Sequence, residues 1–214
     1  MYSVMGTYTL LPRPGLLKSL LKTLRYSIHH KGWVNQLGMR NPGIEKGINK
    51  YYVQPHRRIV SICGFNYGEW KTLAEYTRGI RLELNLSCPN VGMKGNTGCP
   101  VELFDTGHVI VKMSPLTTEN EIVSYMERGV RKWHFSNTLP ISQGGLSGKT
   151  LMTYNAKLIK FTLGEDKGAR IIGGGGVSDM GDVRFYRDLG CAGVSLGTVC
   201  FKPFALRKFS VFDE

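Results

Sequence analysis

Three residues near the middle of the chain, Asn85, Cys88 and Asn90, combine one ionisable thiol with two side-chain amides. A thiol can act as a nucleophile or a base, and the amides can orient a ligand by donating and accepting hydrogen bonds. The preceding stretch, 80–86, alternates charged and aliphatic side chains, which predicts a half-buried strand. Pro89 cannot continue a strand, so the chain must turn where the thiol stands. The sequence therefore predicts a reactive thiol at a strand end.

Strand-like and helix-like segments alternate around this point. We expect strands near 7–10 and at 58–63, 81–86, 109–113, 132–136, 170–173 and 193–196, with helices at 67–77, 118–128, 153–163 and 180–189. Such alternation predicts a parallel sheet. Several of these strands end in Gly, Ser, Asn or Thr, so the expected architecture is an α/β barrel with its ligand site at the carboxyl ends of the strands. A doubly wound open sheet is the alternative.

The run from Asn85 to Asn90, Asn-Leu-Ser-Cys-Pro-Asn, resembles the substrate loop of the dihydroorotate dehydrogenases. These are FMN-dependent oxidoreductases of pyrimidine biosynthesis, built on a TIM (β/α)8 barrel. Other segments resemble the same family, in the same order, over nearly the whole chain: 6–15, 34–43, Lys112, Asn137 with Thr138, 144–148, 171–177 and 195–198.

The resemblance implies a role for each matching residue. Cys88 would be the catalytic base that removes the C5 proton of dihydroorotate while C6 passes a hydride to FMN. Lys112 would lie near the flavin ring, where a cation stabilises the negative charge of the reduced form. The substrate would be bound by Asn35, Asn85, Asn90, Asn137 and Thr138. Besides Lys112, FMN would be bound by Gly145, Ser147, Gly175, Gly176, Gly197 and Thr198. Glycines at strand ends let backbone N–H groups approach a phosphate.

Two irregularities modify the expected barrel. The family has a strand and a helix before the point where this chain's strand pattern begins, and 91–108 holds no good helix. We therefore expect one domain over 1–214, shortened at the N-terminus to about seven strands, with exposed edges that a homodimer would cover. The cysteine-base branch of the family also usually carries lysine where Gly6 stands. No motif reveals the second electron acceptor.

Composition narrows the class of protein. The 214 residues include five cysteines without metal-ligand spacing, so no metal is expected. With no signal peptide or bilayer-spanning run, we expect a cytoplasmic protein with free thiols, in which Cys63, Cys191 and Cys200 are buried. The formal net charge is +12. Because the charges are dispersed, this favours attraction for anionic ligands over a nucleic-acid partner.

The segment 16–28 predicts an amphipathic helix with leucines on one face and lysines elsewhere. It could make peripheral contact with a membrane, or pack over the mouth of the barrel. Two other functions stay open. The first is a flavoenzyme like the tRNA-dihydrouridine synthases, which the +12 charge favours but the short length does not. The second is a reduced, non-catalytic barrel that binds flavin or nucleotide.

Overall fold

The protein is described from a computed structural model, which covers residues 2–86, 99–201 and 209. Seven strands form one sheet in the order β1-β4-β5-β6-β7-β10-β11, and every neighbouring pair is parallel. The strands are β1 (Ser3–Tyr8), β4 (Arg58–Ile62), β5 (Leu82–Asn85), β6 (Ile110–Met113), β7 (Lys132–Phe135), β10 (Arg170–Gly174) and β11 (Gly193–Ser195).

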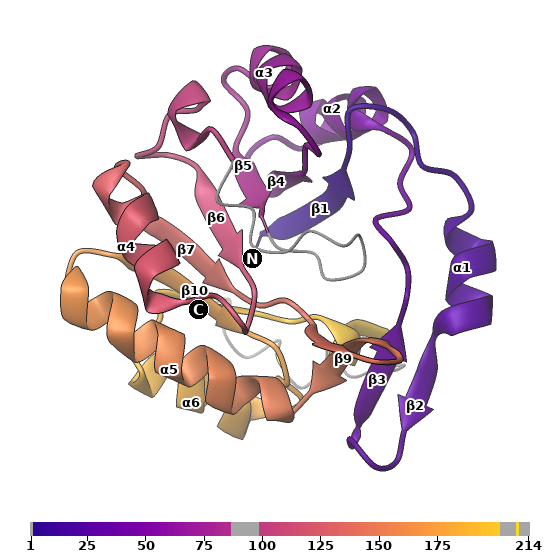
Figure 1. Ribbon diagram of the computed structural model, residues 1–214, viewed down its shortest axis with the longest axis vertical. Coiled ribbons are helices and arrows are strands. Elements are labelled where there is room, and N and C mark those ends of the chain that lie inside the picture. The colour runs from indigo at the N-terminus through magenta and orange to yellow at the C-terminus, as the bar shows by residue number, and fades with distance from the viewer. Residues whose placement is uncertain (1, 87–98, 202–208, 210–214) are drawn as a thin grey trace.

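The sheet curls, and its helices lie outside the curl (Figure 1). They are α2 (Ile44–Val53), α3 (Tyr67–Tyr76), α4 (Glu119–Glu127), α5 (Thr150–Glu165) and α6 (Met180–Asp188), with short 3-10 turns at Val101–Leu103 and Thr198–Phe201. Each new strand is added on the same side of the one before it, so the order never reverses. This confirms the barrel-type fold with about seven strands. A doubly wound sheet, which reverses at its switch point, is wrong.

Capping residues fix where several helices begin. The Thr118 side chain accepts a hydrogen bond from the Glu121 amide, and the Glu121 side chain accepts one from the Thr118 amide. Asp179 and Asp182 form the same reciprocal pair at the start of α6, and Asn66 caps α3. Each pair satisfies amides that would otherwise lack a partner at a helix start. The predicted boundaries of these three helices are therefore close to those observed.

Side chains alternate strictly between the two faces of the sheet. Apart from Arg58, the outward positions of β4 to β7 are apolar and pack under the helices, as with Val60, Leu84, Val111 and Trp133, each 0% exposed. The intervening positions face the inside of the curl, and apart from Ile59 and Ile110 they are polar. The prediction of a half-buried β5 is wrong: all four of its residues are buried, because helices cover one face and polar partners cover the other.

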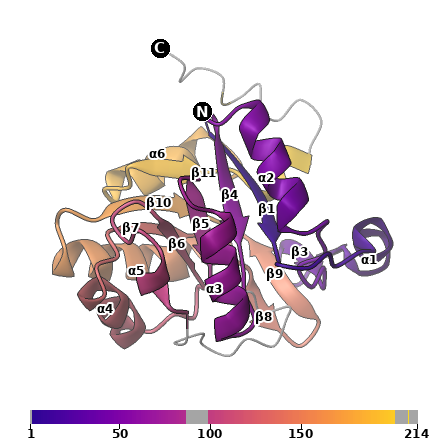
Figure 2. The same ribbon diagram turned by 90° about the horizontal axis from the view of Figure 1, so that it is seen from above.

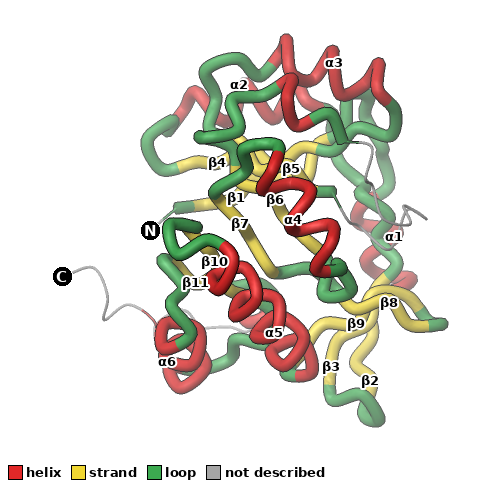
Figure 3. The backbone as a smooth tube through the Cα atoms, turned by 60° about the vertical axis from the view of Figure 1, so that its left-hand side comes forward, coloured by secondary structure: helices red, strands yellow, loops and turns green. Residues whose placement is uncertain are grey.

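A second, four-stranded sheet was not predicted. It has the order β2-β3-β9-β8 and is antiparallel throughout. Its strands are β2 (Arg25–Ser27), β3 (Gly32–Asn35), β8 (Leu139–Ile141) and β9 (Gly144–Gly148). Figure 3 shows it projecting from one end of the main sheet, and β9 runs directly into α5.

Helix α1 (Leu16–Thr23) precedes β2 and stands beyond β3, apart from the other helices (Figure 2). The helix predicted over 16–28 is wrong after Thr23, since the chain becomes extended at Leu24 and forms β2. No residue of α1 is buried. Within the described ranges, no helix is both long and apolar enough to cross a bilayer.

Candidate functional site

Three inward-facing polar residues lie in one row near the carboxyl ends of adjacent strands. In the register of the sheet, Lys112 on β6 is the partner of Asn85 on β5 and of His134 on β7. Partners in a parallel ladder direct their side chains to the same face, so the three side chains meet inside the curl. Two of them, Asn85 and Lys112, were predicted site residues. His134 was not.

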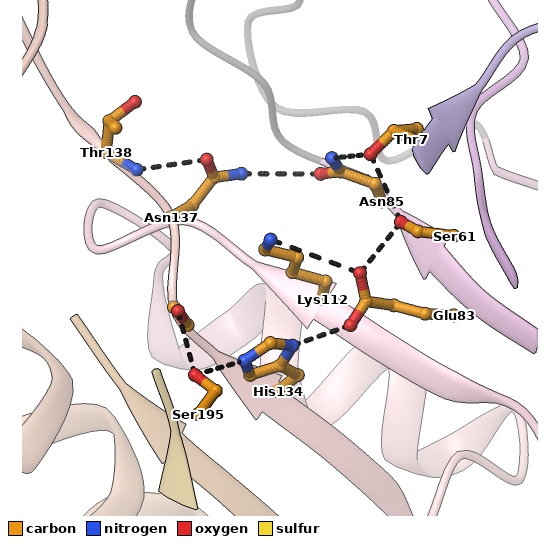
Figure 4. Close-up of polar contacts among 10 residues, drawn as sticks. Thr7, Ser61, Glu83, Asn85, Lys112, His134, Asn137, Thr138 and Ser195 are labelled. Atoms are coloured by element: carbon orange, nitrogen blue, oxygen red, sulfur yellow. Dashed lines mark hydrogen bonds and ion pairs between the residues drawn. The ribbon is translucent and has the colours of Figure 1, made fainter. Parts of the chain in front are cut away.

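The predicted amides are joined by hydrogen bonds at the upper edge of this row (Figure 4). Asn85 Nδ2 donates to Thr7 Oγ1 at 2.8 Å, and Asn137 Nδ2 donates to Asn85 Oδ1 at 3.3 Å. The Thr138 amide in turn donates to Asn137 Oδ1 at 3.0 Å. The structure therefore assembles Asn85, Asn137 and Thr138, which come from two strand ends far apart in the sequence. Each amide orientation is fixed by its neighbour.

A second set of polar contacts is centred on Glu83, which lies deeper inside the curl than the row of Asn85, Lys112 and His134. Glu83, two residues before Asn85 on β5, is 0% exposed. Its Oε1 accepts a hydrogen bond from Ser61 Oγ at 2.7 Å and lies 4.0 Å from Lys112 Nζ. Its Oε2 lies 2.6 Å from His134 Nδ1, and His134 Nε2 lies 2.8 Å from Ser195 Oγ. These contacts therefore link side chains across the sheet, from Ser61 on β4 to Ser195 on β11.

Electrostatics keep the central carboxyl group ionised. Burial by itself would raise the pKa of Glu83, but the charges of Lys112 and His134 and hydrogen bonds from His134 and Ser61 lower it to about 2. A buried charge is tolerated when it is paired and hydrogen-bonded in this way. The inner wall thus carries a fixed negative charge beside the Lys112 cation.

Three predicted residues lie in the small sheet. Asn35 ends β3 and is the register partner of Gly145, whose carbonyl accepts a hydrogen bond from Asn35 Nδ2 at 3.5 Å. Ser147 Oγ donates to the Trp33 carbonyl at 3.1 Å. These contacts hold β3 against β9. The structure gives Ser147 a role within this sheet, in addition to any role toward a ligand.

The two glycine-rich strand ends differ from each other. Gly175 and Gly176 follow β10 with φ of +81° and +80°, and a Cβ on Gly176 would come within 2.8 Å of the Gly148 carbonyl. Packing within the protein therefore requires Gly176. By contrast, a Cβ on Gly197 would meet nothing within 4 Å, and Gly197 precedes Thr198 at the start of a 3-10 turn. The backbone at Gly197 is open to an approaching group.

Acidic side chains already occupy the start of α6, near the β10 end. Asp182 accepts a hydrogen bond from the Ser178 amide at 2.8 Å and pairs with Lys149. Burial would raise the pKa of Asp182, but these partners lower it. The amides of Ser178, Asp179 and Asp182 at the start of α6 thus donate to the protein's own carboxylates. An anion near these strands would find its open backbone at Gly197 instead.

Gly6, where the family's cysteine-base branch usually has lysine, is sterically required here. Its φ is +102°, and an added Cβ would approach Tyr8 Cδ2 at 2.7 Å and the Ser61 carbonyl at 2.8 Å. A residue with a side chain would be strained at this position. The cation of the row is Lys112, on β6.

Two predicted residues, Cys88 and Asn90, lie outside the described residues. None of the four described cysteines, Cys63, Cys99, Cys191 and Cys200, forms a disulfide. The prediction of burial is confirmed for Cys63 and Cys191 and wrong for Cys200, which is exposed in the 3-10 turn after β11 and contacts the Leu196 carbonyl. No group of three His, Cys, Asp or Glu side chains that could hold a metal ion occurs in the described ranges.

Sequence reasoning missed Glu83, His134 and Ser195. Glu83 was read as one charge in an alternating strand, and His134 was hidden in the expected strand 132–136. The only sequence signal was period-two alternation, with polar residues at most inward positions. The partners are 51 and 61 residues apart, so only the spatial order of the strands reveals the network.

Comparison with known proteins places this geometry in context. No protein-family model matches the chain. It is 30% identical over 212 residues to the catalytic subunit of dihydroorotate dehydrogenase B (NAD(+)) from Saccharolobus solfataricus, covering 87% of this chain and 71% of that protein. The protein of the same name from Malacoplasma penetrans is 27% identical over 217 residues, covering 84% and 70%.

Solved structures agree in fold. The crystal structure of dihydroorotate dehydrogenase from Eimeria tenella in complex with ferulenol matches with a TM-score of 0.72. The match covers 97% of this chain and 72% of that one at 19% identity. A ligand-free structure of the same enzyme matches with a TM-score of 0.71.

Proposed function

This chain belongs to the dihydroorotate dehydrogenase family, and we propose that it oxidises dihydroorotate to orotate with FMN. The observation that carries the proposal is the assembly of Asn85, Lys112 and Asn137 at the carboxyl ends of β5, β6 and β7. These elements are distant in sequence, yet they present a cation and two oriented amides on one inner surface. A planar, anionic pyrimidine needs that combination of donors, acceptors and positive charge.

The residues also fit a flavin phosphate and ring. Lys112 Nζ lies 4.0 Å from Glu83, which is too long for a hydrogen bond, so its N–H donors are not spent on that carboxylate. The open backbone at Gly197 and Thr198 suits a phosphate. Gly145, Ser147, Gly175 and Gly176 would complete the FMN site. When bound, FMN would supply the hydride acceptor.

The protein's own residues would divide the remaining work. Asn35, Asn85, Asn90, Asn137 and Thr138 would hold the amide and carboxylate edges of dihydroorotate. Cys88 would accept the proton from C5 as the hydride leaves C6, which gives the C5–C6 double bond of orotate. Since a free thiol has a pKa of about 8.5, Cys88 needs only modest activation near neutral pH. The Lys112 charge would stabilise negative charge on the reduced cofactor.

The test is the visible absorption spectrum of the purified protein, before and after anaerobic addition of dihydroorotate. Oxidised-flavin bands that bleach with substrate would support the proposal. Cys88→Ser should keep the bands but bleach far more slowly near neutral pH. A protein that is colourless and does not take up added FMN would contradict the enzyme and favour a reduced, non-catalytic barrel.

A further inference from the structure

A buried carboxylate stands directly behind the proposed flavin cation. Glu83 is held by Ser61 on one oxygen and by His134 on the other, at 2.7 Å and 2.6 Å. Lys112 Nζ is 4.0 Å from the oxygen that Ser61 binds. None of the roles assigned above to substrate or flavin contacts uses Glu83 or His134.

The hydrogen-bond directions follow from the ionised carboxylate. A carboxylate can only accept, so His134 Nδ1 carries the hydrogen in its contact with Glu83 Oε2. His134 Nε2 then faces Ser195 Oγ at 2.8 Å, and that hydroxyl lies 3.2 Å from Ser136 Oγ. Both nitrogens of the ring are therefore engaged. The imidazole is fixed in place and so fixes the rotation of the carboxylate.

The distances assign different roles to the contacts. Ser61 and His134 make short hydrogen bonds, which set where the carboxylate points. Lys112, with its side chain 20% exposed, is beyond hydrogen-bond distance but within ion-pair distance. The carboxylate attracts the ammonium without saturating its three N–H donors. A cation that must serve a ligand needs a fixed position and unspent donors.

We propose that Glu83 and His134 are positioning residues that act through Lys112. Glu83 holds the ammonium in the row of Asn85, and His134 keeps the carboxylate turned toward Lys112. That Lys112 presents its charge to flavin rests on the proposed function. The contacts of Glu83 and His134 are present in the flavin-free protein, so their effect on Lys112 is tested in that form.

The experiment measures how fast an acylating reagent labels Lys112 in the flavin-free protein, followed by peptide mass spectrometry. The reagent must reach Nζ, and the facing carboxylate holds this side chain inside the curl, where it is 20% exposed. Glu83→Gln removes that hold and should raise the labelling rate several-fold. Glu102→Gln, which removes a carboxylate 64% exposed at the surface, is the matched control and should change nothing.

Two variants of His134 separate positioning from general damage to the fold. His134→Leu removes the donor to Glu83 and should also raise Lys112 labelling. His134→Asn places an amide donor near the position of Nδ1 and should restore slow labelling. If Glu83→Gln does not fold, Glu83→Asp keeps the charge but draws it back by one methylene, and it should label faster than the wild type. Unchanged labelling in the folded variants of both residues would overturn the proposal.

Adding FMN separates the positioning role of Glu83 and His134 from the proposed flavin function. In the wild type, FMN should protect Lys112 from the reagent. If FMN gives no protection but labelling still depends on Glu83 and His134, the flavin function fails and the positioning role stands. If FMN protects Lys112 while the variants label like the wild type, the positioning role fails and the flavin function stands.

Discussion

Asn85 and Asn137, 52 residues apart, are hydrogen-bonded side chain to side chain inside the curl of the sheet. This contact makes the two amides one unit. Asn137 donates to Asn85, and Asn85 passes its own donor to Thr7. Because the Thr138 backbone amide can only donate, and does so to Asn137 Oδ1, the direction of both side-chain amides is determined, although each taken alone could adopt either orientation.

Asn137→Asp should disrupt this unit and weaken substrate binding. The new carboxylate would face Asn85 Oδ1, an acceptor, and would repel the carboxylate of dihydroorotate. We expect KM for dihydroorotate to rise by about 10- to 100-fold, consistent with a lost charge-assisted contact of about 1–3 kcal/mol. Steady-state kinetics check this result. Asn120→Asp, on the exposed surface of α4, is the control with the same chemical change. An unchanged KM in Asn137→Asp would contradict the substrate role.

Stability should fall in acid because of Glu83. Its pKa is lowered from 4.5 to about 2 in the folded protein, so the folded state binds fewer protons than the unfolded state between these values. The stabilisation is complete above about pH 4.5 and is lost as the pH falls through about 2. It amounts to about 3 kcal/mol for this group. Urea unfolding between pH 5 and pH 2 measures the slope.

Glu83→Gln provides the comparison for that slope. An amide has no proton to gain in this range, so the variant should be less stable at pH 5 and lose less stability on acidification. Other acidic groups with lowered pKa values, such as Asp182, are present in both proteins and cancel in the difference. Parallel slopes for the two proteins would show that folding does not lower the pKa of Glu83.

Two glycine substitutions should separate packing from ligand binding. Gly176→Ala puts a Cβ within 2.8 Å of the Gly148 carbonyl at φ +80°, and it should destabilise the fold by about 1–3 kcal/mol. Gly197→Ala meets no protein atom within 4 Å, so it should leave the melting temperature nearly unchanged. If Gly197 admits a phosphate, the same alanine should weaken FMN binding, measured by quenching of flavin fluorescence. Equal FMN affinity in Gly197→Ala would place the phosphate elsewhere.

Helix α1 gives a prediction about membranes. Leu17 and Leu21 are 75% and 86% exposed, and Lys18 and Lys22 lie on the same short helix. An apolar face flanked by cations should bind vesicles that contain anionic lipid, and binding should fall with added salt. Co-sedimentation with phosphatidylserine vesicles checks this result, with phosphatidylcholine vesicles as the uncharged comparison.

The matched variants for this test are Leu17→Glu with Leu21→Glu, which should abolish sedimentation, and Leu116→Glu, which should not. Leu116 is also exposed, at 53%, but lies before α4. Equal sedimentation of all variants would mean that α1 is not the contact. No sedimentation of the wild type with either vesicle would favour a protein partner on this face.

The sequence predicts the main sheet well because its strands are short apolar runs bounded by turn residues, and because helices such as α4 and α6 carry capping pairs. It does not predict β2, β3, β8 and β9, since these strands are only three to five residues long and pair only with one another. It places Asn85, Lys112 and Asn137 by family resemblance. It cannot place His134, whose partners Glu83 and Ser195 become neighbours only when the strands lie in order.

The strand order also determines when each part of the chain can fold during synthesis. In the main sheet, each strand pairs with one that leaves the ribosome before it, so this sheet can grow steadily from β1 toward β11. The small sheet cannot, because β3 must wait for β9, and Asn35 meets Gly145 only after 110 more residues have been made. The first half of the chain can therefore form its strands early. The Asn35 side of the site is completed only when the second half emerges.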